Sequence, residues 1–271
     1  MMTSEKFDNS ILIAAHPDDE ILWFSSLLDA VDEVLISFLE CKSQPVWTSG
    51  RKKSLSEYPM KNILCFGMSE SEVFDNNNWH EPVVTKFGIK LSDNELPARK
   101  YTQNYWELKR KLESKLQHYS NVITHNPWGE YGNEDHVQLY RVVRQLQEKL
   151  HFKLWFSNYC SNKSFNLMLQ YVSCSHFKYI TLETNKTLTN SIKTLYQKNG
   201  CWTWYDDWQW PDTESFIEDR SFESRTQTCG HFLPLNFVSV ELSDQSKKTR
   251  TPIRYNLNFV ISKLFGKNKD R

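Results

Sequence analysis

A short apolar run that leads straight into charge, ILIAAHPDDE at residues 11–20, constrains the fold more than any other feature of the sequence. The apolar residues 11–15 predict a buried strand. Pro17 predicts a turn after it, and the three acidic residues that follow suit the first turn of a helix, where the helix dipole stabilises negative charge. A buried strand that passes through a turn into a helix is typical of α/β proteins.

The same alternation of strand and helix continues along the chain. Strands are predicted at residues 11–15, 33–39, 121–124 and 152–156, and helices at residues 21–30, 51–66, 104–118, 136–150 and 188–199. Residues 69–101 predict a long polar loop, and Gly67 is expected to end the helix before it. The order predicts an α/β fold with a Rossmann-like, mostly parallel sheet, helices on both faces and a C-terminal extension.

The charge and cysteine content exclude several classes of protein. The 33 basic residues balance the 33 acidic ones, so no net field attracts nucleic acid or an anionic membrane. No run of 18 or more apolar residues predicts a transmembrane segment. The six cysteines are scattered without a CxxC pair, which indicates reduced thiols and a cytoplasmic protein. The sequence leaves a homo-oligomer open.

Residues 245–271 form a basic tail, and they include an apolar segment at residues 255–267. This segment is expected either to dock on the core as a helix or to make a peripheral contact with a membrane surface, and docking is the commoner arrangement. A second aromatic segment, residues 201–211, predicts either packing on the core or the wall of a sugar cleft.

The charged turn after residue 15 has the composition of a metal site. A helix N-cap would explain the acidic residues but not His16, and three adjacent carboxyl groups repel one another unless a cation neutralises them. A second polar turn, residues 126–136, also follows a strand and opens a helix, and it brings His136 to the same edge of the sheet. His16, Asp19 and His136 would hold Zn²⁺ and leave one position for water, with Asp18 as the base; Fe²⁺ and other divalent ions suit the same ligands.

Two motifs resemble those of the PIG-L/LmbE-type N-acetylglucosaminyl deacetylases: AAHPDDE at residues 14–20 and GEYGNEDH at residues 129–136. Between them, RKKSLSEYPMKNILCFGM at residues 51–68 is similar to a helix of that family. The resemblance covers the first 160 residues and implies a Rossmann-like zinc hydrolase that removes acetyl groups from N-acetylated amino sugars.

The resemblance also implies roles for single residues. His16, Asp19 and His136 match the zinc ligands, Asp18 the general base, and Tyr131 a tyrosine that stabilises the oxyanion or protonates the product.

Further residues are expected around the substrate. Arg51 and Asp75 match substrate-binding positions of the family, and Trp128 is expected to stack on a sugar ring at the mouth of the site. His125 follows a strand near the site. We expect a structural role for it rather than a contact with substrate.

The sequence departs from the family at Asn133, where a histidine that supports the transition state is common, with Asp135 to orient it. Asparagine donates a hydrogen bond to an oxyanion but carries no positive charge. Ser54 is a second departure, where the family often has glutamate.

Three functions follow: an N-acetyl sugar deacetylase, an amidase on another sugar-linked amide, or a zinc-containing sugar-binding module without turnover. We assign residues 1–160 to a Rossmann-like catalytic core and residues 161–271 to a C-terminal part of the same domain that completes the sheet and the substrate cleft.

Overall fold

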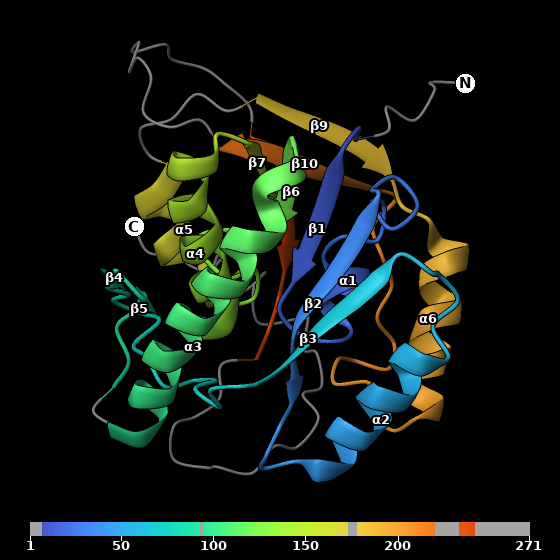
Figure 1. Ribbon diagram of the computed structural model, residues 1–271, viewed down its shortest axis with the longest axis horizontal. Coiled ribbons are helices and arrows are strands. Elements are labelled where there is room, and N and C mark those ends of the chain that lie inside the picture. The colour runs from blue at the N-terminus through green and yellow to red at the C-terminus, as the bar shows by residue number, and fades with distance from the viewer. Residues whose placement is uncertain (1–6, 93–94, 173–177, 220–232, 242–271) are drawn as a thin grey trace, which may run out of the picture.

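The computed structural model describes residues 7–92, 95–172, 178–219 and 233–241, and its centre is a seven-stranded sheet (Figure 1). The strand order is β3-β2-β1-β6-β7-β10-β9. The parallel strands are β1 (Ser10–Ala14), β2 (Glu33–Glu40), β3 (Ile63–Ser69), β6 (Asn121–Thr124) and β7 (Lys153–Ser157). Two further strands, β10 (Thr213–Asp219) and β9 (Lys178–Glu183), extend the β7 edge in antiparallel pairing.

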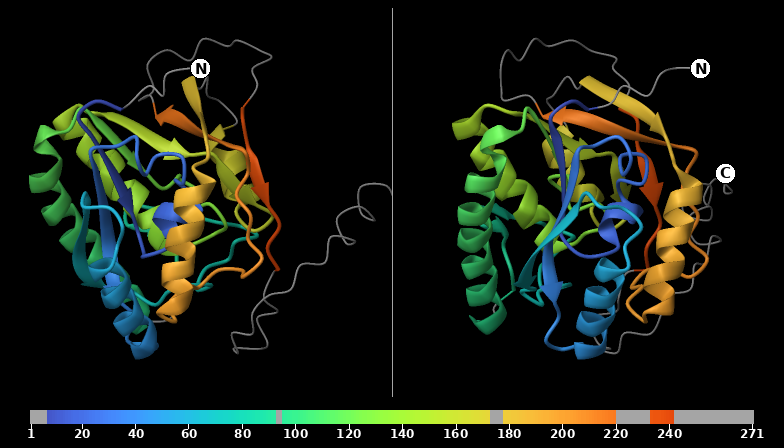
Figure 2. Two further views of the ribbon diagram at one scale, coloured as in Figure 1. Left: turned by 90° about the vertical axis from the view of Figure 1, so that its right-hand side faces the viewer. Right: turned by 45° about the vertical axis from the view of Figure 1, so that its right-hand side comes forward.

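Helices cover both faces of the sheet, as Figures 1 and 2 show. On one face lie α3 (Glu95–Lys115), α4 (Glu134–Leu150) and α5 (Phe165–Val172), with the 3-10 helix η1 (Leu116–His118) after α3. On the other lie α1 (Asp19–Leu22), α2 (Pro45–Ser56) and α6 (Lys186–Lys198). The mostly parallel α/β fold predicted from the sequence is therefore confirmed.

Each face of the sheet has its own apolar core. Side chains alternate along a strand, so Ile11 and Ile13 of β1 join the core beneath α3 and α4, whereas Leu12 and Ala14 join the core beneath α6. This double burial explains why β1 reads as a continuous apolar run.

Four short strands lie outside the main sheet. The strands β4 (Val84–Thr85) and β5 (Gly88–Ile89) pair in antiparallel orientation, and β8 (Tyr159–Ser161) pairs in parallel with β11 (Asn236–Val238). The strands β9, β10 and β11 come from the second part of the chain, and β9 and β10 complete the main sheet. The division of the chain at residue 160 stays a prediction.

The helix predicted at residues 21–30 is wrong, because α1 ends at Leu22 and turns follow. Hydrogen bonds to a residue distant in the sequence compete there with the hydrogen bonds of a helix. The backbone N–H of Ser26 donates to the Glu214 carboxylate of β10 (2.8 Å), and so does the Ser26 hydroxyl (2.7 Å). A backbone donor that bonds a side chain from another element is unavailable to the helical ladder.

The helix predicted at residues 51–66 is also wrong in extent. The helix α2 begins at Pro45, a residue that suits the first helical turn, and ends at Ser56. The residues at its predicted end form β3, where Gly67 has a φ of 67° beside an irregularity in the pairing with β2. Gly67 thus serves a bulged edge strand rather than a helix end. The loop predicted at residues 69–101 contains β4, β5 and the start of α3.

Some predictions fall on residues outside the described ranges. They concern the basic tail from residue 245, its segment 255–267 with the proposed membrane contact, and two of the six cysteines, Cys174 and Cys229. The other four cysteines are free thiols. Among the described residues, no helix has the length and apolar composition that crossing a membrane requires.

Candidate active site

The two charged turns meet at the point where the strand order reverses. From β1 the chain moves outward to β2 and β3, then returns to β6 on the other side of β1, so that β1 and β6 are neighbours (Figure 1). Open α/β sheets bind ligands in the crevice beyond such neighbouring carboxyl ends. The turn after β1 carries residues 16–20, and the turn after β6 carries residues 125–136.

Two imidazoles from these turns converge on one carboxylate oxygen of Asp19. Asp19 Oδ2 lies 3.0 Å from His16 Nδ1 and 3.1 Å from His136 Nε2. All three residues are buried, and their ligand atoms lie within 4.8 Å of one another. The structure therefore brings together the three residues predicted as metal ligands, although a role in binding stays a prediction.

The bonding of His136 fits a cation at this point. Its Nδ1 lies 2.8 Å from Glu130 Oε2 and donates to it, whereas its Nε2 is buried and has no hydrogen-bond partner. The neutral ring then directs the Nε2 lone pair at an Asp19 oxygen, so two acceptors face each other. Such a contact is unfavourable unless a proton or a metal ion lies between the two atoms. A donor set of two imidazoles and a carboxylate is a common set for Zn²⁺.

Without a metal, a proton takes that place. Burial by itself would lower the pKa of His136, but the nearby carboxylates of Asp19 and Glu130 outweigh burial and raise the pKa to about 9. Burial raises the pKa of Glu130, but His125 and His136 outweigh it and hold the pKa at about 2.

In the cluster formed by His16, Asp19 and His136, each imidazole is oriented by a carboxylate behind it. Glu130 lies behind His136, and Asp135 Oδ2 lies 3.5 Å from His16 Nε2. Carboxylates in this position fix the tautomer and direction of a metal-binding histidine. Asp135, which lacks the histidine partner of the resembled family, thus has His16 as a neighbour, and its other oxygen accepts a bond from the Ser71 hydroxyl.

In a second group of candidate ligands, His125, Glu130 and His136, hydrogen bonds engage both ring nitrogens of His125. His125 Nδ1 donates to Glu130 (3.0 Å), and His125 Nε2 accepts the backbone N–H of Ala15 (2.9 Å). The ring stacks on that of His136 with centroids 3.7 Å apart. Because both nitrogens are engaged, His125 has a structural position behind His136.

Asp18 is the N-cap residue of α1, but its carboxylate does not cap the helix. Asp18 precedes the helix but makes no capping bond, and its backbone has a φ of 101°. Its Oδ2 instead accepts from Thr203, a residue of the aromatic segment 201–211. Burial, with the charge of Asp19, raises the pKa of Asp18 to about 7, against the opposing charge of Arg51. A pKa near neutrality suits a group that takes up and returns a proton.

Tyr131 and Asn133 form a bonded pair at the start of α4. Asn133 Nδ2 donates to the Tyr131 hydroxyl oxygen (2.8 Å), and Asn133 Oδ1 accepts the backbone N–H of Asp135 as the N-cap of the helix (2.9 Å). Because the phenol oxygen accepts from Asn133, its own proton is left to donate elsewhere. The Tyr131 and His136 rings lie 5.5 Å apart, centroid to centroid, so the Tyr131 ring lies beside the three proposed ligands.

The expectation that Trp128 stacks on a sugar is wrong. Trp128 is 0% exposed, its indole N–H donates to the Tyr159 carbonyl (2.7 Å), and its ring packs on Phe156 and Tyr171. The turn after β6 directs this side chain into the core, where it packs between β7 and α5.

Arg51 and Asp75, predicted to bind substrate, each have a partner within the protein. Arg51 is buried and forms an ion pair with Glu70 near Asp18, and Asp75 forms an ion pair with Lys163. The substrate-binding roles of both residues stay predictions.

Three contacts around the site were not predicted from the sequence. Thr203 reaches Asp18 across 185 positions, and Tyr58 and Tyr196 both donate to the Glu20 carboxylate. The aromatic pattern of residues 201–211 marks the segment that contains Thr203, but no local pattern marks the threonine itself.

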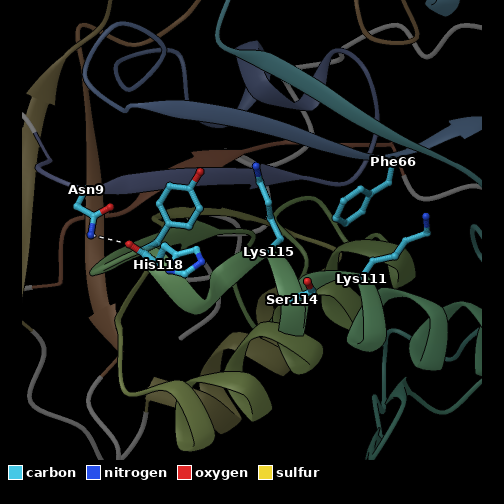
Figure 3. A pocket seen from close by; sticks show the side chains of 7 residues that line it. Asn9, Phe66, Lys111, Ser114, Lys115 and His118 are labelled. Atoms are coloured by element: carbon cyan, nitrogen blue, oxygen red, sulfur yellow. Dashed lines mark hydrogen bonds between the residues drawn. The ribbon is translucent and has the colours of Figure 1, made fainter.

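Two surface hollows lie apart from the cluster. The larger, about 500 Å³, is lined by residues of α3 and η1 with Asn9, which precedes β1, so it lies toward the opposite end of that strand (Figure 3). The smaller, about 260 Å³, is lined by Gln197, Gly200, Trp202 and Asp206, next to Thr203. Neither includes a residue of the cluster.

A viral protein is similar to the chain in sequence. No protein-family model matches the sequence. The uncharacterized protein L374 of Acanthamoeba polyphaga mimivirus is 23% identical over 202 residues, which cover 68% of this chain and 82% of that protein.

Three solved structures, all of deacetylases, are similar to the chain in their fold. One is a deacetylase of the teicoplanin biosynthesis pathway in complex with teicoplanin (12% identity, TM-score 0.48, 79% of this chain and 100% of that chain). Another is the zinc-inhibited form of teicoplanin deacetylase Orf2 (11% identity, TM-score 0.48, with the same coverage). The third is the A40926 pseudoaglycone deacetylase Dbv21 (10% identity, TM-score 0.46, 78% and 97%). At this level of similarity, we base the function on the residues of the site.

Proposed function

We propose that this protein is a metal-dependent hydrolase that removes the acetyl group from an N-acetylated amino sugar. The observation that carries the proposal is the buried His136 Nε2, which has no hydrogen-bond partner and faces Asp19 at 3.1 Å. The Asp18 carboxylate, whose pKa is raised to about 7, lies in the same turn as Asp19. The acetylated sugar is inferred from the two motifs that resemble the PIG-L/LmbE-type deacetylases.

His16, Asp19 and His136 would hold the metal ion, with Glu130 and Asp135 behind the two imidazoles. Zn²⁺ is the proposed ion, and Fe²⁺ also suits these ligands. When bound, such an ion supplies Lewis acidity, which makes water more acidic and polarises a carbonyl oxygen.

Asp18 moves the proton in the proposed reaction. Its carboxylate accepts a proton from water as the water oxygen attacks the acetyl carbonyl carbon, and it later returns that proton to the sugar nitrogen. The amide C–N bond then breaks to give acetate and a free amine. The Tyr131 hydroxyl donates to the developing oxyanion, and Asn133 holds the phenol oxygen in place by its hydrogen bond (2.8 Å).

A screen for free amine and acetate tests this function. Metal-loaded protein is offered N-acetylglucosamine as the free sugar and in nucleotide-linked, lipid-linked and polymeric forms. We expect at least one linkage class to be turned over. The Asp18→Asn variant should keep its metal and lose about a hundredfold or more in rate, because the base is removed. As a matched control, Asp212→Asn removes an exposed carboxylate that pairs with Lys186 and should leave the rate unchanged.

The alternative is a metal-containing sugar-binding module without turnover, and Asn133 is the observation that favours it. Asparagine neither carries charge nor passes on a proton at the position where the resembled family commonly has histidine. This alternative would be established if the protein binds one metal ion per chain and binds sugar, but releases no amine from any linkage class. Amine release only from other sugar-linked amides would instead identify an amidase with the same residues.

A further inference from the structure

We propose that Thr203 is a positioning residue for Asp18, and that it fixes the carboxylate so that one oxygen faces the reacting water. The inference rests on the proposed function. Thr203 lies in the segment between α6 and β10. Its hydroxyl donates to Asp18 Oδ2 at 2.6 Å, and its backbone N–H donates to the same oxygen at 3.2 Å.

The two bonds leave the other carboxylate oxygen available. Among the described residues, no hydrogen bond reaches Asp18 Oδ1, although the residue is only 2% exposed. Two donors on one oxygen set both the position and the rotation of the carboxyl plane. A base held in a single orientation loses little freedom when the reaction begins, which raises the rate of the chemical step.

The backbone of Asp18 is held from the other side by Glu20. A φ of 101° is unusual for a residue with a side chain and requires support from its surroundings. The Asp18 N–H donates to Glu20 Oε2 at 2.9 Å. The second Glu20 oxygen accepts from the hydroxyls of Tyr58 (2.9 Å) and Tyr196 (2.7 Å).

One stretch of chain therefore supports both sides of Asp18. Tyr196 lies in the last turn of α6 and acts through Glu20, and Thr203 follows seven positions later and acts directly. The Cys201 N–H donates to the Tyr196 carbonyl at 3.0 Å, which ties the two supports together. The chain beyond residue 160 thus takes part in orienting a base that belongs to the first motif.

Two variants of Thr203 test the inference. Thr203→Val keeps the shape of the side chain but lacks the hydroxyl, and it should lower kcat about tenfold or more, with unchanged KM and metal content. Thr203→Ser keeps the hydroxyl and should restore kcat to within about threefold of the parent. As a matched control, Thr102→Val removes a hydroxyl that bonds the Ala98 carbonyl on α3, and it should leave kcat unchanged.

A second measurement does not depend on turnover. Amide hydrogen exchange at Thr203, followed by NMR, should accelerate about tenfold in the Asp18→Ala variant, because the acceptor of that N–H is removed. Exchange at Cys201, whose N–H bonds a backbone carbonyl, should change little.

The outcomes separate the inference from the proposed function. Thr203→Val with the parent's kcat, or unchanged exchange at Thr203, would overturn the positioning role even in an active enzyme. A parent protein that turns over no substrate would contradict the proposed function. The hydrogen-exchange measurement alone would then decide whether Thr203 holds Asp18.

Discussion

In the proposed metal site, a metal ion and a proton would compete for one atom, His136 Nε2. Its Nε2 faces Asp19 at 3.1 Å, and the surrounding carboxylates raise its pKa to about 9 in the metal-free protein. Near neutral pH the ring therefore carries a proton, which a metal ion bound at the proposed site would have to displace.

We expect Zn²⁺ binding at pH 7 to release roughly one proton or more per chain and to weaken as the pH falls, because a proton on His136 blocks the ligand atom. Calorimetry in buffers of different ionisation enthalpy measures the release. His80→Gln, which removes an exposed histidine outside the cluster, should release the same number. Binding with no proton release at pH 7 would argue against His136 as a ligand.

At the scale of elements, the start of α4 combines a helix cap with a hydrogen bond to Tyr131, the proposed donor to the oxyanion. Asn133 caps the helix through Oδ1 and holds Tyr131 through Nδ2. The two functions use different atoms, so substitutions can separate them.

Asn133→Asp keeps a good cap but loses the donor to Tyr131, so it should lower kcat at nearly unchanged stability. Asn133→Ala loses both contacts and should lower kcat and also lower the free energy of unfolding by about 1 kcal/mol. Urea denaturation and steady-state kinetics measure the two effects. Equal stability of the alanine and aspartate variants would show that the cap contributes nothing.

The elements also show how far local pattern determines structure. The strand at residues 121–124 and the helix that begins near His136 were predicted because their apolar periodicity is strong and their ends are marked by polar turns. The boundary between α2 and β3 was missed because residues 57–66 carry no clear period, and pairing with β2 decides their conformation.

For the whole molecule, buried acidic groups make the stability of the metal-free protein depend on pH. Burial raises the pKa of Glu20 and Glu134 to about 7 from the ordinary value of 4.5. A group whose pKa is higher in the folded than in the unfolded state contributes its full stabilisation of the folded state when the pH is below its unfolded-state pKa. That contribution is lost as the pH rises through its folded-state pKa. His136, raised from 6.5 to about 9, acts in the same direction at higher pH.

The free energy of unfolding should therefore fall from pH 5 to pH 9 when metal is removed with a chelator. Urea denaturation at several pH values measures it. Saturating Zn²⁺ should reverse or flatten this trend, because metal binding to the folded state strengthens as protons leave His136. A metal-free protein that is more stable at pH 9 than at pH 5 would contradict the raised pKa values.

The sequence by itself determined the alternation of strands and helices, the sheet edge where the charged turns lie, and the meeting of His16, Asp19 and His136. The first two features depend on short-range order, because a strand of known direction fixes where the next few residues lie. The meeting of the three side chains was inferred from the parallel sheet, and it also needs β1 and β6 to be neighbours, which the tertiary structure supplies. Tertiary structure alone decided the burial of Trp128, the contact between Thr203 and Asp18, and the loss of the helix after Leu22. In each case the deciding partner lies more than 25 positions away, and only the packed fold sets its distance.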